Sequence, residues 1–396
     1  MFATQEIGSL PKPAWLIKCS NGIFPSEDDI REAKYWGKML EIEGFEKLTN
    51  LLHESDSTQK RREVQRWAVI FAIRFLESTG LSRVYDGEML RREMYEHPIN
   101  RIGGFKFLGR VQSFDNRYYN IASVVDEIER IEPIYVQEFK LAKSIARKEL
   151  KVPITGAYTL ADWTLSDYYL KKYFTTCSSI KEAKQKARRE LVFELIEKVL
   201  KPEIKELVNN GANWIQIDEP AATTHLDKQE MKLFIESFNM LTEGFSIKFS
   251  LHNCYGNYKV LAKYTPELRN CNQLALEFAN RDSLTLGVKD IDRPGYKDLK
   301  SFVQNGYAGN FGIGALHVLD YEGKTTKWAV LKDKTLIESP SLIRDRLVYA
   351  VRVVGDPSKI SVNPDCGLRT RKDWRIIRQK LRNMVQAAEE DDWVSR

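Results

Sequence analysis

Eight segments with the character of β-strands alternate with helical segments along this chain of 396 residues. The predicted strands lie at 5–9, 82–88, 152–157, 214–218, 246–252, 273–277, 311–318 and 359–364. Regular alternation of strands and helices predicts a parallel sheet, because parallel strands need long crossover connections. Eight such units predict an α/β fold of the (β/α)₈, or TIM-barrel, type. In this fold the functional site lies at the carboxyl ends of the strands.

The helices between these strands are predicted from the 3.6-residue spacing of apolar positions. One helix begins after Ser26, where Ser26 and Asp29 have the spacing of a capping box. Further helices are predicted over 59–78, 134–148, 180–209, 228–241, 258–264, 341–354 and 371–388. We expect residues 1–396 to form a single barrel domain with two insertions, a hairpin near 105–121 and a charged excursion near 320–337.

Composition narrows the class of protein. The formal net charge is +6, but basic and acidic residues are interspersed, which is typical of a solvated surface and gives no sign of nucleic-acid binding. Five widely spaced cysteines, an odd number, argue against a disulfide framework and for a reducing, cytoplasmic location. No run of about 18 apolar residues is present, so we expect no membrane span.

Polar residues that can do chemistry fall at the predicted strand ends. These residues are Glu88, Asp218, His252, Cys254, Glu277 and Cys366. His252 and Cys254 are two positions apart, so in extended backbone both side chains point to the same side. With Cys366 they make a Cys₂His set, the composition of a catalytic zinc site with three firm ligands. Glu277 is the candidate for a fourth, exchangeable position.

Each of these residues also has a purely structural interpretation. His252 could be a buried core histidine, Cys366 a small apolar side chain and Glu277 an ion-pair partner. A zinc ion with an open position either activates water for hydrolysis or binds and deprotonates a substrate thiol. Two protein thiolates make zinc a weaker Lewis acid for water and keep a bound sulfur electron-rich. The ligand set therefore favours alkylation of a thiol over hydrolysis.

Seven motifs occur in the order found in one known family. They are Ile7-Gly8-Ser9-Leu10-Pro11, Asp86-Gly87-Glu88, Thr155-Gly156, Gln216 through Ala221, His252-Asn253-Cys254-Tyr255, Leu276-Glu277 and Asn363 through Arg371. With these motifs the chain resembles the C-terminal catalytic barrel of cobalamin-independent methionine synthase. The resemblance covers nearly the whole chain, and the last motif is the most specific. We expect the short form of this family, without the additional N-terminal barrel of its long form.

The resemblance implies a zinc-dependent methyltransferase that methylates homocysteine to methionine. It implies that His252, Cys254, Glu277 and Cys366 hold Zn²⁺. It further implies that Glu88 and Asp218 bind the homocysteine ammonium group and that the backbone amides of Ile7 and Ser9 hold its carboxylate. The partners so implied are homocysteine and a methyl donor.

The methyl donor stays open, because the sequence departs from the family after the seventh strand. The family has an Asp-x-His-Ser motif there, whose histidine assists departure of the donor. In this chain His317 is offset by about two positions, a shift that keeps the same face of a strand, and is the candidate proton donor. Trp163 could stack on a pterin or belong to the core. The candidate donors are 5-methyltetrahydrofolate, methylcobalamin and a methylated corrinoid protein.

Three alternative functions remain at this point. The first is transfer of an alkyl group to another thiol, such as coenzyme M. The second is hydrolysis by a zinc-activated water, and the third is binding of zinc or a thiol without catalysis. Glu88 and Asp218 favour a thiol that carries an amino group.

Overall fold

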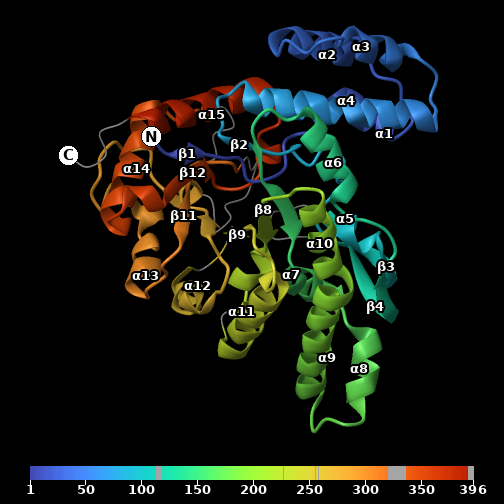
Figure 1. Ribbon diagram of the computed structural model, residues 1–396, viewed down its shortest axis with the longest axis vertical. Helices are drawn as coiled ribbons and strands as arrows, with labels where there is room; N and C mark the ends of the chain where they lie inside the picture. The colour runs from blue at the N-terminus through green and yellow to red at the C-terminus, as the bar shows by residue number, and fades with distance from the viewer. Residues whose placement is uncertain (113–117, 226, 255, 257, 320–335, 391–396) are drawn as a thin grey trace.

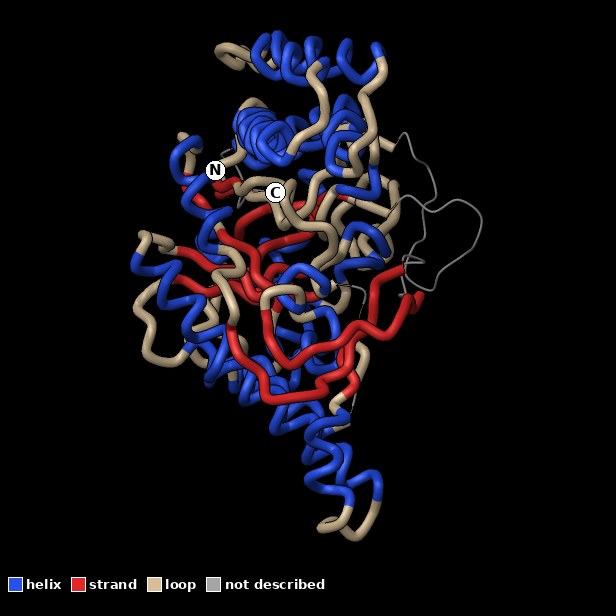
Figure 2. Tube along the Cα trace, turned by 90° about the vertical axis from the view of Figure 1, so that its right-hand side faces the viewer, coloured by secondary structure: helices blue, strands red, loops and turns tan. Residues whose placement is uncertain are grey.

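A parallel sheet at the centre of the molecule carries the fold. The structure is a computed structural model that describes the chain except residues 113–117, 226, 255, 257, 320–335 and 391–396. The strands of the sheet are β1 (Ala3–Thr4), β6 (Val152–Thr155), β8 (Trp214–Asp218), β9 (Lys248–Asn253), β10 (Gln273–Leu276), β11 (Asn310–Leu316) and β12 (Ile360–Pro364). Their order is β1-β12-β11-β10-β9-β8-β6, and every neighbouring pair is parallel. Figure 2 shows these strands in the interior, with helices around them.

One short strand closes the sheet into a barrel. β2 (Arg83–Val84) pairs in parallel with β5 (Glu149–Leu150), which directly precedes β6. On its other side Arg83 forms a parallel bridge with Gln5, just beyond β1. The predicted (β/α)₈ barrel is thereby confirmed. The first strand was predicted two residues too late, since β1 ends at Thr4 and residues 6–9 leave the sheet.

Helices connect the strands and cover the barrel from outside (Figure 1). They are α5 (Glu96–Ile99), α6 (Val136–Ile145), α7 (Ala157–Asp162), α9 (Ile180–Glu194), α10 (Lys201–Asn209), α11 (Lys228–Thr242), α12 (Tyr258–Tyr264), α13 (Leu299–Gln304), α14 (Pro340–Val354) and α15 (Trp374–Glu389). A π-helical segment, Leu195–Leu200, joins α9 to α10, so 180–209 is continuously helical, as predicted. The pair α8 (Asp167–Phe174) and α9 projects away from the barrel.

The first four helices form a layer at the amino-terminal end of the chain. They are α1 (Ala14–Ser20), α2 (Glu27–Met39), α3 (Glu46–His53) and α4 (Thr58–Glu77), with α2 and α3 stacked on α4 in Figure 1. The capping box predicted for Ser26 and Asp29 is present at the start of α2. Gly37 in the same helix permits close packing, because a Cβ there would lie 2.4 Å from Cγ of Phe45. Glycine at a buried helix position is thus explained by packing rather than by turn formation.

The two predicted insertions differ in how much of them is described. The hairpin is longer than the predicted 105–121: β3 (Ile102–Gln112) and β4 (Tyr118–Arg130) pair antiparallel, and β7 (Thr164–Leu165) pairs in parallel with β4. The excursion near 320–337 lies outside the described residues, apart from its last two positions. No helix among the described residues has the length and apolar character needed to cross a membrane.

The barrel interior is polar. Gln5 donates a hydrogen bond to Oε1 of Gln273 at 2.8 Å, and Gln273 donates to Oγ of Ser361 at 2.7 Å. All three side chains are buried; Gln5 directly follows β1, Gln273 is in β10 and Ser361 is in β12. Buried polar groups of this kind are tolerated when they are hydrogen-bonded to one another. Further buried polar side chains lie at the carboxyl ends of the strands, among them Asp218, His252 and Glu277.

Candidate metal and amino-acid site

Three side chains that can bind a metal meet at the carboxyl end of the barrel. His252 is the fifth residue of β9, Cys254 follows that strand, and Cys366 follows β12. One ligand atom from each lies within 4.8 Å of the others, and the two sulfur atoms are 3.6 Å apart. His252 and Cys254 thus lie on the same side of the chain, as their spacing of two positions predicted. The barrel supplies Cys366 from a strand more than 100 residues further on.

The surroundings of the cluster suit a soft divalent metal. His252 Nδ1 lies 2.9 Å from the carbonyl oxygen of Ala275, which fixes the ring and leaves Nε2 for the cluster. This buried Nε2 has no hydrogen-bond partner among the described residues. The hydrogen bond between the thiols lowers the pKa of Cys366 and raises that of Cys254. The cluster therefore offers a histidine nitrogen and two cysteine sulfurs, and the thiol of Cys366 loses its proton readily. Such a set of ligands fits Zn²⁺ better than Mg²⁺ or Ca²⁺.

Glu277 lies next to the cluster but not within it. It follows β10, is buried, and its Oε1 is 3.9 Å from Nε of Arg281. Its charge is close enough to raise the pKa of Cys254, although the hydrogen bond from Cys366 and burial are larger causes. It does not belong to the group of ligand atoms within 4.8 Å of one another. As a fourth zinc ligand Glu277 therefore stays a prediction.

A carboxylate pair shares a cavity with the cluster. The cavity holds about 930 Å³ of space, part of it open to solvent. Ile7, Ser9, Glu88, Asp218, His252, Cys254 and Cys366 all contribute to its wall. Asp218 ends β8 directly beside His252 in the register of β9, and burial raises the pKa of its carboxyl to about 7. Five residues that were predicted from distant motifs, Ile7, Ser9, Glu88, Asp218 and Cys366, thus line the same space as His252 and Cys254.

Glu88 reaches the cavity from a turn with a left-handed backbone. Gly87 has φ +62° and Glu88 has φ +56°, an uncommon value for a residue other than glycine. The turn is held because the backbone N–H of Glu88 donates to Oδ1 of Asp86 at 2.8 Å. Strained backbone of this kind concentrates at functional sites.

The segment Ile7 to Ser9 lines the cavity. No described residue accepts a hydrogen bond from the N–H of Ile7 or Ser9. Gly367 packs on this segment, since a Cβ at Gly367 would lie 2.9 Å from the nitrogen of Ser9. The segment that left the sheet after β1 is thereby held beside the Cys366 motif, with two donors available for a ligand.

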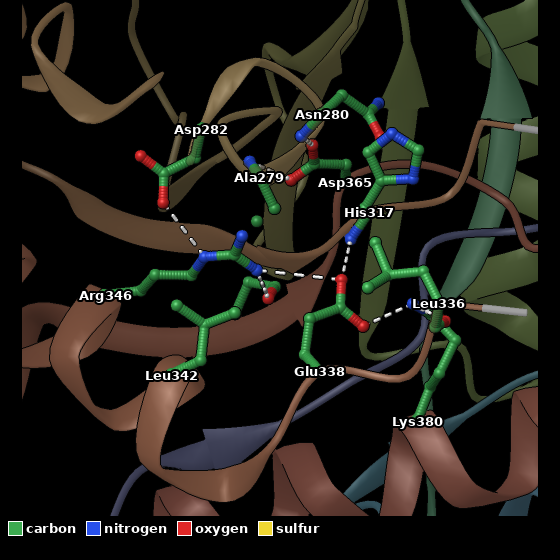
Figure 3. A network of polar contacts seen from close by, with 12 residues as sticks. Ala279, Asn280, Asp282, His317, Leu336, Glu338, Leu342, Arg346, Asp365 and Lys380 are labelled. Carbon is green, nitrogen blue, oxygen red and sulfur yellow. Dashed lines mark hydrogen bonds and ion pairs between the residues drawn. The ribbon is translucent and has the colours of Figure 1, made fainter. Parts of the chain in front are cut away.

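His317 is buried elsewhere and does not line the cavity. Its Nδ1 lies 2.5 Å from Nη2 of Arg371, and its backbone N–H donates to Oε1 of Glu338 at 2.7 Å (Figure 3). Burial, and then the charge of the Arg371 guanidinium, lower the pKa of His317 to about 3. A bulge between Gly314 and Leu316 explains the placement, because the irregularity changes which way the following residues point. The structure does not bring His317 to the other site residues.

Aromatic side chains form the outer wall of the cavity. Tyr118 and Tyr119 come from β4, and Trp163 follows α7. The rings of Tyr119 and Trp163 have centroids 5.3 Å apart and an interplanar angle of 30°. The hairpin was predicted, but its part in the site was not, because alternation along a strand gives no indication of which cavity it borders. Glu93, Met94, Arg369 and Thr370 also line the cavity.

The fold defines a class of protein, barrel enzymes whose functional site lies at the strand ends, and here a cluster of possible metal ligands lies at that place. Comparison with known proteins narrows the class. The family profile described as "Cobalamin-independent synthase, Catalytic domain" matches residues 22–290 and 332–390. The methionine synthase of Thermoplasma volcanium is 38% identical over 365 residues, which cover 88% of this chain and 95% of the relative. That of Thermoplasma acidophilum is 38% identical and covers 97% and 96%.

Solved structures agree on the fold. A B12-independent methionine synthase from Shewanella sp. W3-18-1, in complex with selenomethionine, superposes with a TM-score of 0.69 at 20% identity, covering 98% of this chain and 97% of that chain. A second, from Listeria monocytogenes, has a TM-score of 0.59 at 13% identity. The chain belongs to the cobalamin-independent methionine synthase family, and it is a methyltransferase.

Proposed function

We propose that the protein transfers a methyl group to the thiol of homocysteine and so forms methionine. The observation that carries this proposal is the shared cavity, in which a His-Cys-Cys cluster faces two carboxylates, Glu88 and Asp218. In the reaction the thiol loses its proton, the sulfur forms a bond to the methyl carbon, and the donor departs with the electrons of the broken bond. Relatives that carry the name methionine synthase support the assignment.

Zinc is the metal that we propose for the cluster. His252, Cys254 and Cys366 would hold it, with Glu277 as a fourth ligand that gives way to substrate. When bound, the metal lowers the pKa of a coordinated thiol, so that thiolate exists at neutral pH. The burial of His252 and Cys254 keeps water away from this position. Two protein thiolates favour reaction at sulfur rather than activation of water, which argues against the hydrolase alternative.

The amino-acid part of homocysteine would be held by charge and by backbone amides. Glu88 and Asp218 would accept hydrogen bonds from the ammonium group, and the N–H groups of Ile7 and Ser9 would donate to the carboxylate. A charge-assisted contact is about twice as strong as a neutral one. This arrangement favours an amino-acid thiol over one with a sulfonate group, such as coenzyme M, whose negative charge the two carboxylates would repel.

For the methyl donor we propose a methylated corrinoid, either methylcobalamin or a corrinoid protein. Departure of a cobalt-bound methyl needs no proton, whereas departure from 5-methyltetrahydrofolate needs one at nitrogen. His317, the predicted proton donor, lies outside the cavity wall and has a pKa near 3, so its imidazole is neutral at pH 7. The placement of His317 supports the corrinoid over the folate.

A direct assay tests this function. Zinc-loaded protein is incubated with homocysteine and either methylcobalamin or 5-methyltetrahydrofolate triglutamate, and methionine is measured. We expect methionine with methylcobalamin and little with the folate. Methionine from the folate alone would overturn the choice of donor. Methylation of coenzyme M but not of homocysteine would overturn the choice of acceptor.

The proposed zinc ligands have a separate test. Cys366→Ser is expected to lose most bound zinc, measured by elemental analysis after dialysis, because a serine oxygen is a far weaker ligand than a thiolate. Cys271→Ser is the matched control, since Cys271 lies beside Tyr307 and not in the cluster. Full zinc retention in Cys366→Ser would remove this residue from the ligand set.

A further inference from the structure

Gln216 connects the two parts of the proposed amino-acid site. It is the middle residue of β8, so its side chain shares the barrel-facing side with Asp218 two positions later. Its Nε2 donates to Oδ1 of Asp218 at 2.7 Å and to the carbonyl oxygen of Ile7, also at 2.7 Å. Both contacts are buried. The same amide therefore holds the Ile7–Ser9 segment and the Asp218 carboxylate.

Lys151 fixes the orientation of this amide. Its Nζ donates to Oε1 of Gln216, and an ammonium group can only donate. The amide oxygen must then face Lys151, which leaves both N–H groups of Gln216 for Ile7 and Asp218. Burial lowers the pKa of Lys151 to about 8, so the side chain is mostly charged at pH 7. The carboxyl of Glu6 acts against this lowering, and burial raises the pKa of Glu6 itself to about 8.

We propose that the Lys151–Gln216 pair positions the amino-acid site by fixing Asp218 relative to the Ile7–Ser9 segment. This inference rests on the proposed binding of homocysteine. Without the pair, the carboxylate of Asp218 and the amides of Ile7 and Ser9 would no longer be spaced for an α-amino acid. Zinc and thiol binding would remain, because neither residue contacts His252, Cys254 or Cys366 through any hydrogen bond in the described part of the chain. Gln216 is thus a positioning residue that sets selectivity.

Two variants separate this role from a general contribution to folding. Gln216→Glu has nearly the same size and keeps an acceptor for Lys151, but it loses both donors and places a second carboxylate beside Asp218. Lys151→Met leaves Gln216 in place but removes the donor that anchors its amide oxygen. Gln273→Glu is the matched control, because Gln273 is also a buried glutamine inside the barrel and contacts Gln5 and Ser361 instead.

The experiment measures thiol binding without turnover. Each protein is loaded with Co²⁺ in place of zinc and titrated with L-homocysteine and, separately, with 2-mercaptoethanol, which has a thiol but no amino-acid group. The sulfur-to-cobalt charge-transfer band reports thiolate binding directly. We expect Gln216→Glu to raise the apparent Kd for homocysteine about tenfold or more, as for loss of a hydrogen bond to a charged group. The Kd for 2-mercaptoethanol should change less than about twofold.

The second variant and the control complete the test. Lys151→Met should raise the Kd for homocysteine in the same selective way by about threefold or more, whereas Gln273→Glu should leave the ratio of the two Kd values unchanged. An equal loss for both thiols, or an unchanged Kd for homocysteine in both variants, would overturn the positioning role. If the unaltered protein shows no charge-transfer band with homocysteine, the proposed function itself fails, and the two failures are thereby distinguished.

Discussion

Gly367 shows how tightly the metal and amino-acid parts of the site are joined. A Cβ at this residue would lie 2.6 Å from Oγ and 2.9 Å from N of Ser9, closer than real Cβ contacts allow. We therefore expect Gly367→Ala to displace the Ser9 amide and to raise KM for homocysteine at least about tenfold, as for loss of a charged hydrogen bond. Steady-state kinetics at saturating methyl donor measure this change.

The control for Gly367→Ala is a glycine whose replacement strains only the backbone. Gly244 has φ +87° and open space where a Cβ would lie, so Gly244→Ala is expected to lower stability by about 1 kcal/mol without changing KM. If Gly367→Ala instead lowers stability and leaves KM unchanged, the Ser9 amide does not bind substrate.

Single residues also show where sequence reasoning succeeded and where it stopped. The pairing of His252 with Cys254 followed from strand geometry alone, and Cys366 could be added because barrel strands end at one edge. For His317 the same geometry was misleading, because the bulge between Gly314 and Leu316 lies just before it. A bulge is one extra residue in a hydrogen-bonding pattern, and nothing in the spacing of side chains reveals it.

At the scale of elements, a buried ionic network fastens α14 and α15 to β11. Glu338, just before α14, accepts hydrogen bonds from the backbone N–H of His317 and from Lys380 of α15, and its Oε1 lies 3.6 Å from Nη1 of Arg346 (Figure 3). All of these charged side chains are fully buried. We expect Glu338→Leu to lower the free energy of unfolding by about 3–5 kcal/mol, because Lys380 is left as an unpaired buried charge.

Urea denaturation of a double-mutant cycle checks this explanation. Lys380→Met alone should also destabilise, but Glu338→Leu with Lys380→Met should lose less than the sum of the two single losses, since both charges are removed together. Additive losses would mean that the pair is not coupled. In that case the contacts of Glu338 with His317 and Arg346 would account for its effect.

The elements themselves were predictable to the extent that their signals are local. The capping box at Ser26 and the continuous helix over 180–209 follow from side chains within a few residues of each other. β1 was misplaced because the apolar pattern continues through Ile7 and Leu10 after the sheet hydrogen bonds have ended. Those two side chains are buried by tertiary packing, which imitates a strand in the sequence.

At the scale of the whole molecule, the barrel was predictable and the full cavity was not. Counting strands gave the closed fold, although closure depends on the short strand β2 and its bridge to Gln5. The aromatic wall comes from an insertion outside the barrel repeat, in which β4 brings Tyr118 and Tyr119 to the site. Repeat units predict where strand ends meet, but they contain no information on which insertion covers them.

The stability of the whole molecule should depend on pH through His97. This residue of α5 is buried, with Nε2 3.1 Å from the carbonyl oxygen of Ile134. Burial, and then the charges of Arg91 and Arg101, lower its pKa from 6.5 to about 2. Above pH 6.5 His97 is neutral in both states, but below it only the unfolded state binds the proton. Acidification therefore removes stability from about pH 6.5 down to about pH 2.

The size of this effect can be measured against a variant that does not titrate. When the pH falls from 8 to 5, His97 should lower the unfolding free energy of the wild type by about 2 kcal/mol. His97→Gln lacks this titrating group, so its unfolding free energy should fall by about 2 kcal/mol less over the same interval. Urea denaturation at both pH values measures both losses, and buried carboxyls elsewhere contribute equally to each protein. An identical loss in the two proteins would show that His97 takes up a proton in the folded state. The imidazole would then pair as a cation with Glu138, whose Oε1 lies 3.1 Å from it.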